Sequence, residues 1–309
     1  MSVDEAARIL SAHFRPSRLI GSAVDANVFL KLESELPTGS FKVRGALYAL
    51  TVNASRRRVD EVVASSTGNH GAAVAYAAKS RGIAATIFLP KSPNPVKARK
   101  IASDGARIQE GAGDFAEARE TAAAYARRTG AYLMDDASDP DIPIGAGTMA
   151  LEILADMPDV QTIVVPVGDS ALIRAVAAVA KGRKPDVRIV GVQAERAPAY
   201  FLSWQQGQVV TTDTADTIAD GLATRKPTDA NVATLRELVD EMILVTEDAM
   251  LNAIHRLLFD DHLVAEPSGA AALAAYLRLE PKPPGKTVLI VSGGNVAPDV
   301  LLRAAVVDR

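Results

Sequence analysis

The chain has 309 residues and contains no cysteine, which excludes disulfides, thiolate-ligated zinc, iron–sulfur clusters and a cysteine nucleophile. Its net charge of −3 argues against non-specific nucleic-acid binding, which needs a strong positive field. Any chemistry in this chain therefore depends on Lys, Ser, Thr, Asp, Glu or a bound cofactor.

Neither a membrane span nor a leader is visible in the sequence. No stretch reaches the ~18 consecutive apolar residues that a spanning helix needs. Residues 1–8 are acidic and lack the basic segment and apolar run of a signal peptide. We therefore expect a cytoplasmic protein that has no membrane or nucleic-acid partner.

Short β-branched runs alternate with alanine-rich segments almost throughout the chain. The expected strands are 27–32, 61–66, 85–89, 162–167, 188–193, 242–245 and 287–291. Apolar residues spaced three and four apart predict helices, among them 41–51, 71–80, 95–103, 115–128 and 172–181. Short, continuous, apolar strands that alternate with helices indicate an α/β fold with open, mostly parallel sheets.

Two stretches that contain Pro and Gly, 138–147 and 281–286, are candidate joints between domains. The first follows a self-contained run of strands and helices. We therefore expect a smaller α/β domain, residues 58–139, inserted into a larger domain built from residues 1–57 and 140–309.

Three glycine-bearing turns, 66–71, 168–172 and 292–295, follow predicted strands, and the first two open helices. Unpaired N–H groups and the helix dipole make a helix N-terminus a site for anions. Ligands of open α/β sheets bind at the carboxyl ends of the strands, so we expect the three loops to line one rim. Taken singly, the Gly and Asn residues could equally serve as turn and cap residues.

Lys42 lies in the first turn of a predicted helix that Ser40 caps. A cation at this position is unfavourable against the helix dipole. Two interpretations are open: a solvated lysine that tolerates its position, or a desolvated amine that forms a Schiff base.

Six segments form one ordered set across nearly the whole chain: 40–46, 66–71, 166–168, 217–221, 266–270 and 292–296. In sequence, order and spacing they resemble the fold-type II pyridoxal-phosphate enzymes, specifically the threonine/serine dehydratase and serine racemase branch. The resemblance implies a tryptophan synthase β-like fold of two open, mostly parallel sheets. Residues 301–309 look like a closing helix or tail, so we expect no C-terminal regulatory domain of the kind found in some biosynthetic threonine dehydratases.

The resemblance implies a role for each motif residue. Lys42 would hold pyridoxal 5′-phosphate as a Schiff base, with Phe41 against the ring, Asn69 on the phenolic oxygen and Ser292 on the pyridine nitrogen. The cofactor phosphate would lie on the loop of Gly168, Asp169, Ser170, Ala171 and Leu172. The substrate carboxylate would be received by Ser66, Thr67, Asn69 and His70.

The implied activity is β-elimination from a β-hydroxy amino acid such as L-threonine or L-serine, giving a 2-oxo acid and ammonia. Lys42 would remove the α-proton, and the neutral hydroxyl of Ser292 suits elimination over transamination. A racemase, a β-replacement enzyme and a non-catalytic binder of the cofactor or an amino acid are the alternatives. A nicotinamide dehydrogenase is disfavoured, because no Gly-x-Gly-x-x-Gly follows the first strand. A homodimer is the default assembly.

The phosphate loop departs from the family pattern. The family usually has four consecutive glycines, and here the loop reads Gly168, Asp169, Ser170 and Ala171. An Asp is electrostatically unhelpful close to a phosphate. Either Asp169 points away while Ser170 adds a hydroxyl contact, or the cofactor binds weakly.

Two further departures concern racemisation and metal. Thr67 stands where the racemase branch places a serine as the second acid/base, which disfavours racemase activity. The acidic divalent-cation site of that branch corresponds to Gln193, Ala197 and Ala199, with only Glu195 nearby. Hard cations need oxygen ligands, mostly carboxylates, so we expect no such metal site.

Overall fold

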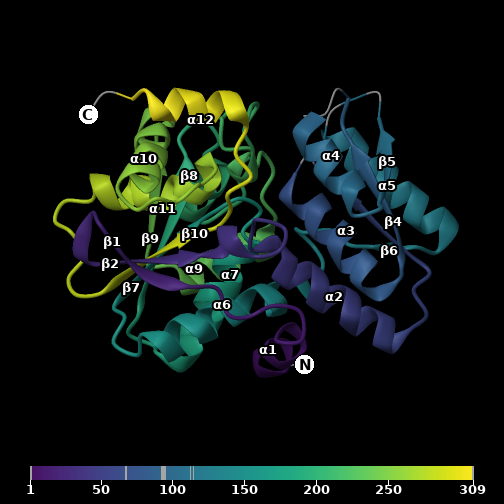
Figure 1. The fold of residues 1–309 in the computed structure, drawn as a ribbon, viewed down its shortest axis with the longest axis horizontal. Helices are drawn as coiled ribbons and strands as arrows, with labels where there is room; N and C mark the ends of the chain where they lie inside the picture. The colour runs from purple at the N-terminus through teal and green to yellow at the C-terminus, as the bar shows by residue number, and fades with distance from the viewer. Residues whose placement is uncertain (1, 67, 92–94, 112, 114, 308–309) are drawn as a thin grey trace. The chain divides into compact units, whose positions relative to one another are not determined.

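A computed structural model describes residues 2–66, 68–91, 95–111, 113 and 115–307. The chain divides into two compact units (Figure 1). Unit 1 comprises Met1–Phe14 and Phe41–Ala146, and unit 2 comprises Arg15–Ser40 and Gly147–Arg309. Helix α6 (Ile142–Asp156) begins in unit 1 and ends in unit 2.

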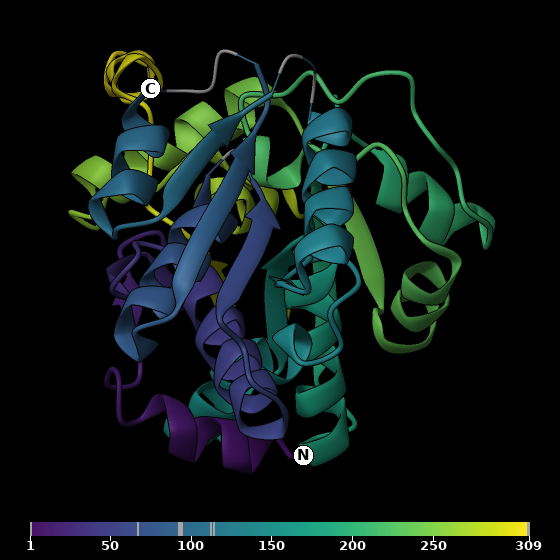
Figure 2. The ribbon, with the colours of Figure 1, turned by 90° about the vertical axis from the view of Figure 1, so that its right-hand side faces the viewer.

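Unit 1 is built on a parallel sheet with the strand order β5-β4-β3-β6. The strands are β3 (Glu61–Ser65), β4 (Ala84–Leu89), β5 (Arg107–Glu110) and β6 (Tyr132–Leu133). Figure 2 shows its blue strands running in the same direction. The helices are α1 (Val3–Leu10), α2 (Lys42–Arg56), α3 (Asn69–Arg81), α4 (Pro95–Ser103) and α5 (Phe115–Thr129).

Helices α3 and α5 cover opposite faces of the unit 1 sheet. Successive side chains of a strand point to opposite faces. On β4, Ile87 lies against Gly71 of α3, while its neighbour Phe88 packs on Ala122 and on the ring of Tyr125 in α5. This alternation explains why β3 and β4 are continuous apolar runs.

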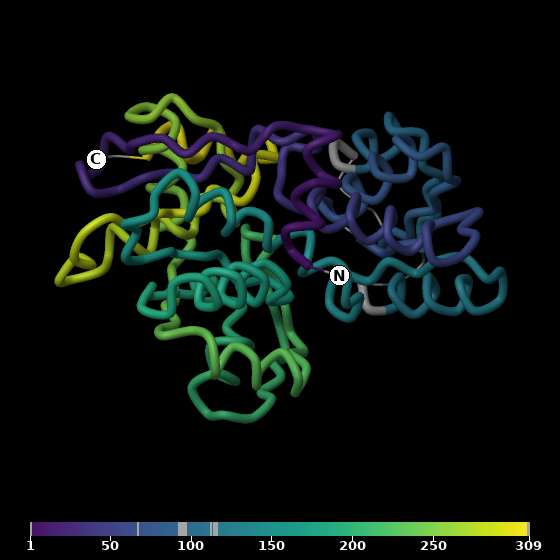
Figure 3. Tube along the Cα trace, turned by 90° about the horizontal axis from the view of Figure 1, so that it is seen from below, coloured from purple at the N-terminus to yellow at the C-terminus, as the bar shows by residue number. Residues whose placement is uncertain are grey.

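Unit 2 contains a second, larger sheet with the order β1-β2-β10-β7-β8-β9. Its strands are β1 (Leu19–Ser22), β2 (Asp25–Leu32), β7 (Thr162–Pro166), β8 (Arg188–Ala194), β9 (Glu241–Val245) and β10 (Thr287–Val291). β1 pairs antiparallel with β2, and the other pairs are parallel. Figure 3 shows β1 and β2 as a purple hairpin.

The unit 2 helices also lie on both faces of their sheet. They are α7 (Ala171–Arg183), α8 (Ala199–Gln206), α9 (Asp229–Leu238), α10 (Glu247–Phe259), α11 (Pro267–Arg278) and α12 (Pro298–Ala305). Val190 and Val192 of β8 belong to the core cluster that contains α11. Gly191, between them, faces Ile173 of α7 on the opposite side. Residues 267–276 of α11 are all buried, since their mostly small side chains allow the helix to lie close to the sheet.

The α/β fold with mostly parallel sheets is confirmed. All seven predicted strands are present, with ends displaced by at most two residues. β1, β5 and β6 have no counterpart among the predicted strands. β1 and β5 contain no buried residue, and β6 has only two residues, so none of them shows the continuous apolar pattern of a buried strand.

The two compact units do not end where the sequence places the domain boundaries. The predicted smaller domain, 58–139, encloses the four-stranded sheet, whereas unit 1 also contains α1, α2 and the start of α6. The boundaries at 57/58 and 139/140 stay a prediction. Within the described ranges, no helix combines the length and the apolar character needed to cross a membrane.

A buried ionic cluster joins β2 to α6 within unit 2. The ammonium of Lys31, which is 0% exposed, donates to Glu152 Oε2 and to the carbonyl oxygen of Ser17, both at 2.6 Å. The Ser17 hydroxyl in turn donates to the buried carboxylate of Glu33 at 2.5 Å. Removing the lysine would take this cation away from the Glu152 carboxylate.

We therefore expect Lys31→Ala to lower the free energy of unfolding by about 3–5 kcal/mol, the range for breaking a buried pair by removing one partner. Urea denaturation followed by circular dichroism measures this change. Lys226→Ala is the matched control, because Lys226 is exposed and its loss should alter stability by less than about 0.5 kcal/mol. Equal stability of the two variants would contradict the role given to the cluster.

Candidate active site

Lys42 is the first residue of α2, and the predicted Ser40 cap is wrong. The N-cap of α2 is Phe41, which is in a helical conformation and makes no side-chain capping bond. Ser40 instead forms an antiparallel β-bridge with Gly293. This extended pairing places Ser40 before the helix, so a backbone contact, and not a cap, precedes Lys42.

The amine of Lys42 contacts the carboxylate of Asp136. Both side chains are mostly buried, at 18% and 12% exposure, and the Phe41 ring centroid lies 5.0 Å from Lys42 Nζ. The carboxylate offsets the unfavourable dipole that a lysine meets in the first turn of a helix. Sequence reasoning missed Asp136, although it follows a strand at its carboxyl end, because that strand is only the two residues of β6.

His70 lies beside the same carboxylate. Its Nδ1 atom is 3.7 Å from Asp136 Oδ1, and its Nε2 atom is 2.9 Å from the carbonyl oxygen of Met134. Unit 1 thus brings together the predicted residues Lys42 and His70 around Asp136, which the sequence did not suggest.

Ser66 and Asn69 belong to the turn between β3 and α3. The Ser66 hydroxyl accepts a hydrogen bond from the backbone N–H of Gly68 at 3.0 Å, and α3 begins at Asn69. A Cβ on Gly71 would come within 3.1 Å of both Ser66 and Ile87, so the turn packs tightly against the strand. The predicted site residue Thr67 lies outside the described residues.

The three predicted loops belong to two different sheets, and the single rim expected from the sequence stays a prediction. The loop 66–71 follows β3 of the four-stranded sheet in unit 1. The loops 168–172 and 292–295 follow β7 and β10, which are neighbours in the six-stranded sheet of unit 2. The chain contains two sheets, each with its own carboxyl edge.

The motif loops of unit 2 pack directly on one another. A Cβ on Gly168 would lie 2.1 Å from the carbonyl oxygen of Gly221, and a Cβ on Gly221 would lie 2.7 Å from Ser268 Oγ. A Cβ on Gly269 would lie 2.2 Å from the carbonyl oxygen of Gly293. Only glycine permits these approaches, so all five motif segments with residues in unit 2 meet in a continuous chain of contacts that ends at the Ser40–Gly293 bridge.

Buried hydroxyls line this packed region. Ser292 donates to the carbonyl oxygen of Ser268 at 3.4 Å. Among the described residues, the buried hydroxyls of Ser40 and Ser268 have no hydrogen-bond partner. Buried polar atoms usually have partners, so these hydroxyls fit a region that holds a polar ligand such as pyridoxal phosphate.

The phosphate loop accommodates its non-glycine residues by specific contacts. Ser170 is the N-cap of α7 in the left-handed region, with φ 64°, and its hydroxyl accepts a hydrogen bond from Arg174 Nε at 3.1 Å. The carboxylate of Asp169 accepts a hydrogen bond from the Thr224 hydroxyl at 3.0 Å. Arg174 of α7 therefore holds its guanidinium against the loop at Ser170. This positive charge suits a phosphate.

Tyr200 and Asn231 support the loop at Ser170. Asn231 donates to the phenolic oxygen of Tyr200 at 3.2 Å. Burial raises the pKa of Tyr200, and hydrogen bonds with Ser170 and Asn231 act in the opposite direction. Ser170 is thus fixed by two neighbours, which stabilises a backbone conformation that costs a non-glycine residue on the order of 1 kcal/mol.

Comparison with known proteins decides the family. Over residues 11–294 the chain matches the family model described as "Pyridoxal-phosphate dependent enzyme". The chain belongs to this family. The L-threonine ammonia-lyase of Thermotoga maritima is 36% identical over 287 residues, which are 93% of this chain and 72% of that protein.

Solved structures agree with this membership. Maize serine racemase has a TM-score of 0.91 and 30% sequence identity, over 98% of this chain and 95% of that chain. A threonine deaminase from the organism abbreviated T.th. has a TM-score of 0.89 and 31% identity, over 96% of this chain and 97% of that chain. The predicted fold-type II fold and pyridoxal-phosphate cofactor are confirmed.

The close approach of Gly269 to Gly293 predicts that a side chain added at position 269 destabilises this pyridoxal-phosphate enzyme. We expect Gly269→Ala to destabilise unit 2 by at least about 2 kcal/mol. The added Cβ would overlap the carbonyl oxygen of Gly293, and a backbone atom cannot move aside as the end of a flexible side chain can. Gly182→Ala on α7 is the control, since nothing lies within 4 Å of its Cβ and alanine favours a helix. Thermal unfolding should lower Tm for the first variant only, and an unchanged Tm would contradict the packing argument.

Proposed function

We propose that this protein is a pyridoxal-phosphate-dependent ammonia-lyase that eliminates water from a β-hydroxy amino acid and releases a 2-oxo acid and ammonia. L-Threonine and L-serine are the proposed substrates. The observation that carries the proposal is the position of Lys42, which follows directly on the Ser40 bridge to the packed glycine motifs and has Phe41 beside its amine. The identity with the T. maritima L-threonine ammonia-lyase supports the same activity.

The residues that would hold the cofactor differ in chemistry. Lys42 would bind it covalently, Phe41 and Asn69 would contact its ring, and the Ser292 hydroxyl would meet its pyridine nitrogen. The phosphate would take the backbone N–H groups of loop 168–172, with Ser170 and Arg174 nearby. When bound, the cofactor supplies an electron sink for the negative charge that develops on the substrate α-carbon.

Protein side chains would transfer the proton and orient the substrate. The Nζ atom of Lys42 takes the α-proton of the substrate, and the proton then rests on an amine that contacts Asp136. Ser66, Thr67, Asn69 and His70 would orient the substrate carboxylate at the N-terminus of α3, where N–H groups without helical partners favour an anion. The uncharged hydroxyl of Ser292 favours elimination over transamination.

We expect Lys42→Ala to lower 2-oxo acid release from L-threonine by at least about 1,000-fold, because one residue supplies both the attachment and the base. Coupled detection of the 2-oxo acid measures the rate. Lys79→Ala is the matched control, since Lys79 is 59% exposed and pairs with Asp104 on the surface. A Lys42→Ala variant with near wild-type turnover would refute the proposal.

Racemisation is the second candidate, because maize serine racemase is among the most similar solved structures. Chiral analysis of the amino acid recovered from the reaction distinguishes it from elimination.

We also propose a cytoplasmic location and a homodimer. Light scattering tests the dimer, whose molar mass should be twice that of the chain.

A further inference from the structure

Ser170 adopts a backbone conformation that is usual for glycine and unusual for serine. Its φ of 64° lies in the left-handed region, where a Cβ makes the conformation unfavourable. The residue is only 1% exposed, so its hydroxyl has to find hydrogen-bond partners within the protein. A glycine would adopt this conformation unaided, whereas a serine needs support from its surroundings.

Two side chains of unit 2 bind the Ser170 hydroxyl. Arg174, four residues later on α7, donates from Nε to Ser170 Oγ at 3.1 Å. Burial raises the pKa of Tyr200 in α8, and a hydrogen bond with Ser170 acts against this rise. A hydrogen bond that lowers the pKa of a phenol is one that its oxygen accepts, so Ser170 donates to Tyr200. The Ser170 hydroxyl is therefore engaged both as acceptor and as donor.

Tyr200 is itself fixed within unit 2. Its side chain lies in the core, with 1% exposure, and Asn231 of α9 donates to its phenolic oxygen at 3.2 Å. The side-chain oxygen of Gln193 in β8 accepts a hydrogen bond from the N–H of Phe201 at 2.9 Å. N–H groups in the first turn of a helix have no partner within the helix, so this bond anchors the start of α8 to the sheet. Tyr200 therefore presents its hydroxyl to Ser170 from a fixed position.

The residues before Ser170 are held by other contacts. The Asp169 carboxylate accepts a hydrogen bond from the Thr224 hydroxyl at 3.0 Å. Gly168 approaches the carbonyl oxygen of Gly221 too closely for either loop to shift toward the other. Both contacts fix the loop up to Ser170, where the left-handed conformation opens α7.

We propose that Tyr200 and the Ser170 hydroxyl are positioning residues for the cofactor phosphate. The inference rests on the proposed function, which places this phosphate on the backbone N–H groups of loop 168–172. A change of φ at Ser170 would turn the peptide groups on both sides of it, and with them the N–H groups of Ser170 and Ala171. The hydrogen bonds of the hydroxyl hold these donors in one orientation before the phosphate binds. Such preorganisation strengthens binding, because less conformational freedom is lost.

Substitutions at Ser170 separate this role from simple packing. Alanine keeps the Cβ but loses the hydroxyl, so the left-handed conformation would lose its support. Glycine also loses the hydroxyl, yet it adopts the conformation freely. Ser170→Ala should therefore weaken phosphate binding more than Ser170→Gly. If the side chain only filled space, the order would be reversed, since glycine leaves the larger gap.

The contribution of the phosphate is measured by comparing pyridoxal 5′-phosphate with pyridoxal, which lacks the phosphate. Each is titrated into full-length protein stripped of cofactor, and the visible absorbance of the bound aldehyde gives Kd. The phosphate ratio is Kd for pyridoxal divided by Kd for pyridoxal 5′-phosphate. We expect Tyr200→Phe and Ser170→Ala each to lower this ratio by about tenfold, the effect of one buried hydrogen bond. Ser170→Gly should stay within about threefold of wild type.

A double variant tests whether Tyr200 acts through Ser170. In the Ser170→Gly background the hydroxyl that links the two residues is already gone. Tyr200→Phe should then change the phosphate ratio by less than about twofold, because coupled residues give non-additive effects. A full loss in both backgrounds would mean that Tyr200 acts by another route and would overturn the inference.

Tyr276→Phe is the matched control. Tyr276 is also a buried tyrosine of unit 2, at 2% exposure, and its hydroxyl donates to Asp25 Oδ2 at 3.0 Å. Asp25 is the first residue of β2, at the amino edge of the sheet, whereas loop 168–172 follows the carboxyl end of the parallel strand β7. This variant loses a comparable hydrogen bond and should leave the phosphate ratio unchanged.

Two failures are distinguishable. A protein that binds no pyridoxal phosphate overturns the proposed function and this inference with it. A holoenzyme that releases a 2-oxo acid from L-threonine, yet keeps its phosphate ratio in Tyr200→Phe or loses as much of it in Ser170→Gly as in Ser170→Ala, overturns the inference alone. If Tyr200→Phe fails to fold, the comparison of Ser170→Ala with Ser170→Gly decides the matter.

Discussion

The close approach of glycine-bearing loops in unit 2 is the constraint on which the candidate site depends. Gly168 meets Gly221, and Gly269 meets Gly293, at separations that leave no room for a Cβ. Gly293 also pairs with Ser40, so the backbone is fixed two residues before Lys42. These backbone contacts within unit 2 join motifs that are far apart in the sequence.

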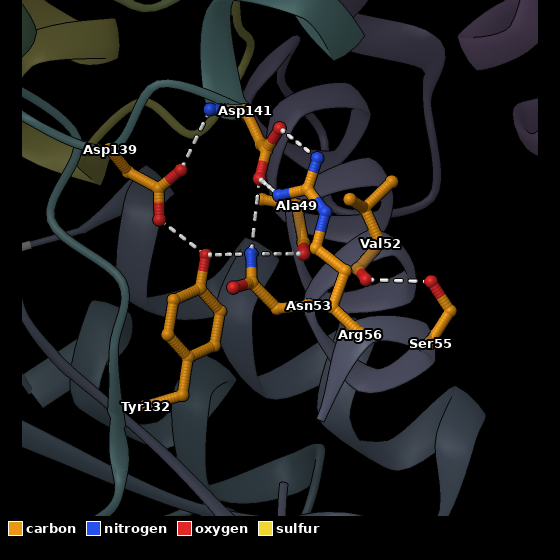
Figure 4. Close-up of polar contacts among 8 residues, drawn as sticks. All are labelled: Ala49, Val52, Asn53, Ser55, Arg56, Tyr132, Asp139 and Asp141. Carbon is orange, nitrogen blue, oxygen red and sulfur yellow. Dashed lines mark hydrogen bonds and ion pairs between the residues drawn. The ribbon is translucent and has the colours of Figure 1, made fainter. Parts of the chain in front are cut away.

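A second constraint is electrostatic. Lys42 occupies the first turn of a helix, where the dipole disfavours a cation, and Asp136 supplies the compensating charge. In unit 1, the ion pair of Arg119 with Asp135 and the ion pair of Arg56 with Asp141 (Figure 4) fix the chain on either side of this aspartate. The same arrangement that stabilises the lysine places a negative charge next to the atom that is proposed to take the substrate proton.

Patterns of apolar residues predicted most of the fold, and the ordered motifs pointed to Lys42 as the proposed attachment lysine. Buried parallel strands such as β7 and β10 leave a continuous apolar signal, whereas β5 and β6 are too exposed or too short to leave one. Asp136 was missed for that reason, since its position follows from β6. The Ser40 cap was predicted wrongly because the pairing of Ser40 with Gly293 is a tertiary contact, 253 residues apart in the chain. The hydrogen bonds of Asp169 with Thr224 and of Ser170 with Arg174 could not be predicted from local sequence patterns either.

The proposed activity depends on the attachment of pyridoxal phosphate to Lys42. Reduction of the purified holoenzyme with borohydride, followed by peptide mass spectrometry, locates the attachment. We expect loss of the visible cofactor absorbance and a phosphopyridoxyl group on the peptide that contains Lys42. A label on another lysine, or a protein that carries no label after incubation with pyridoxal phosphate, would contradict it.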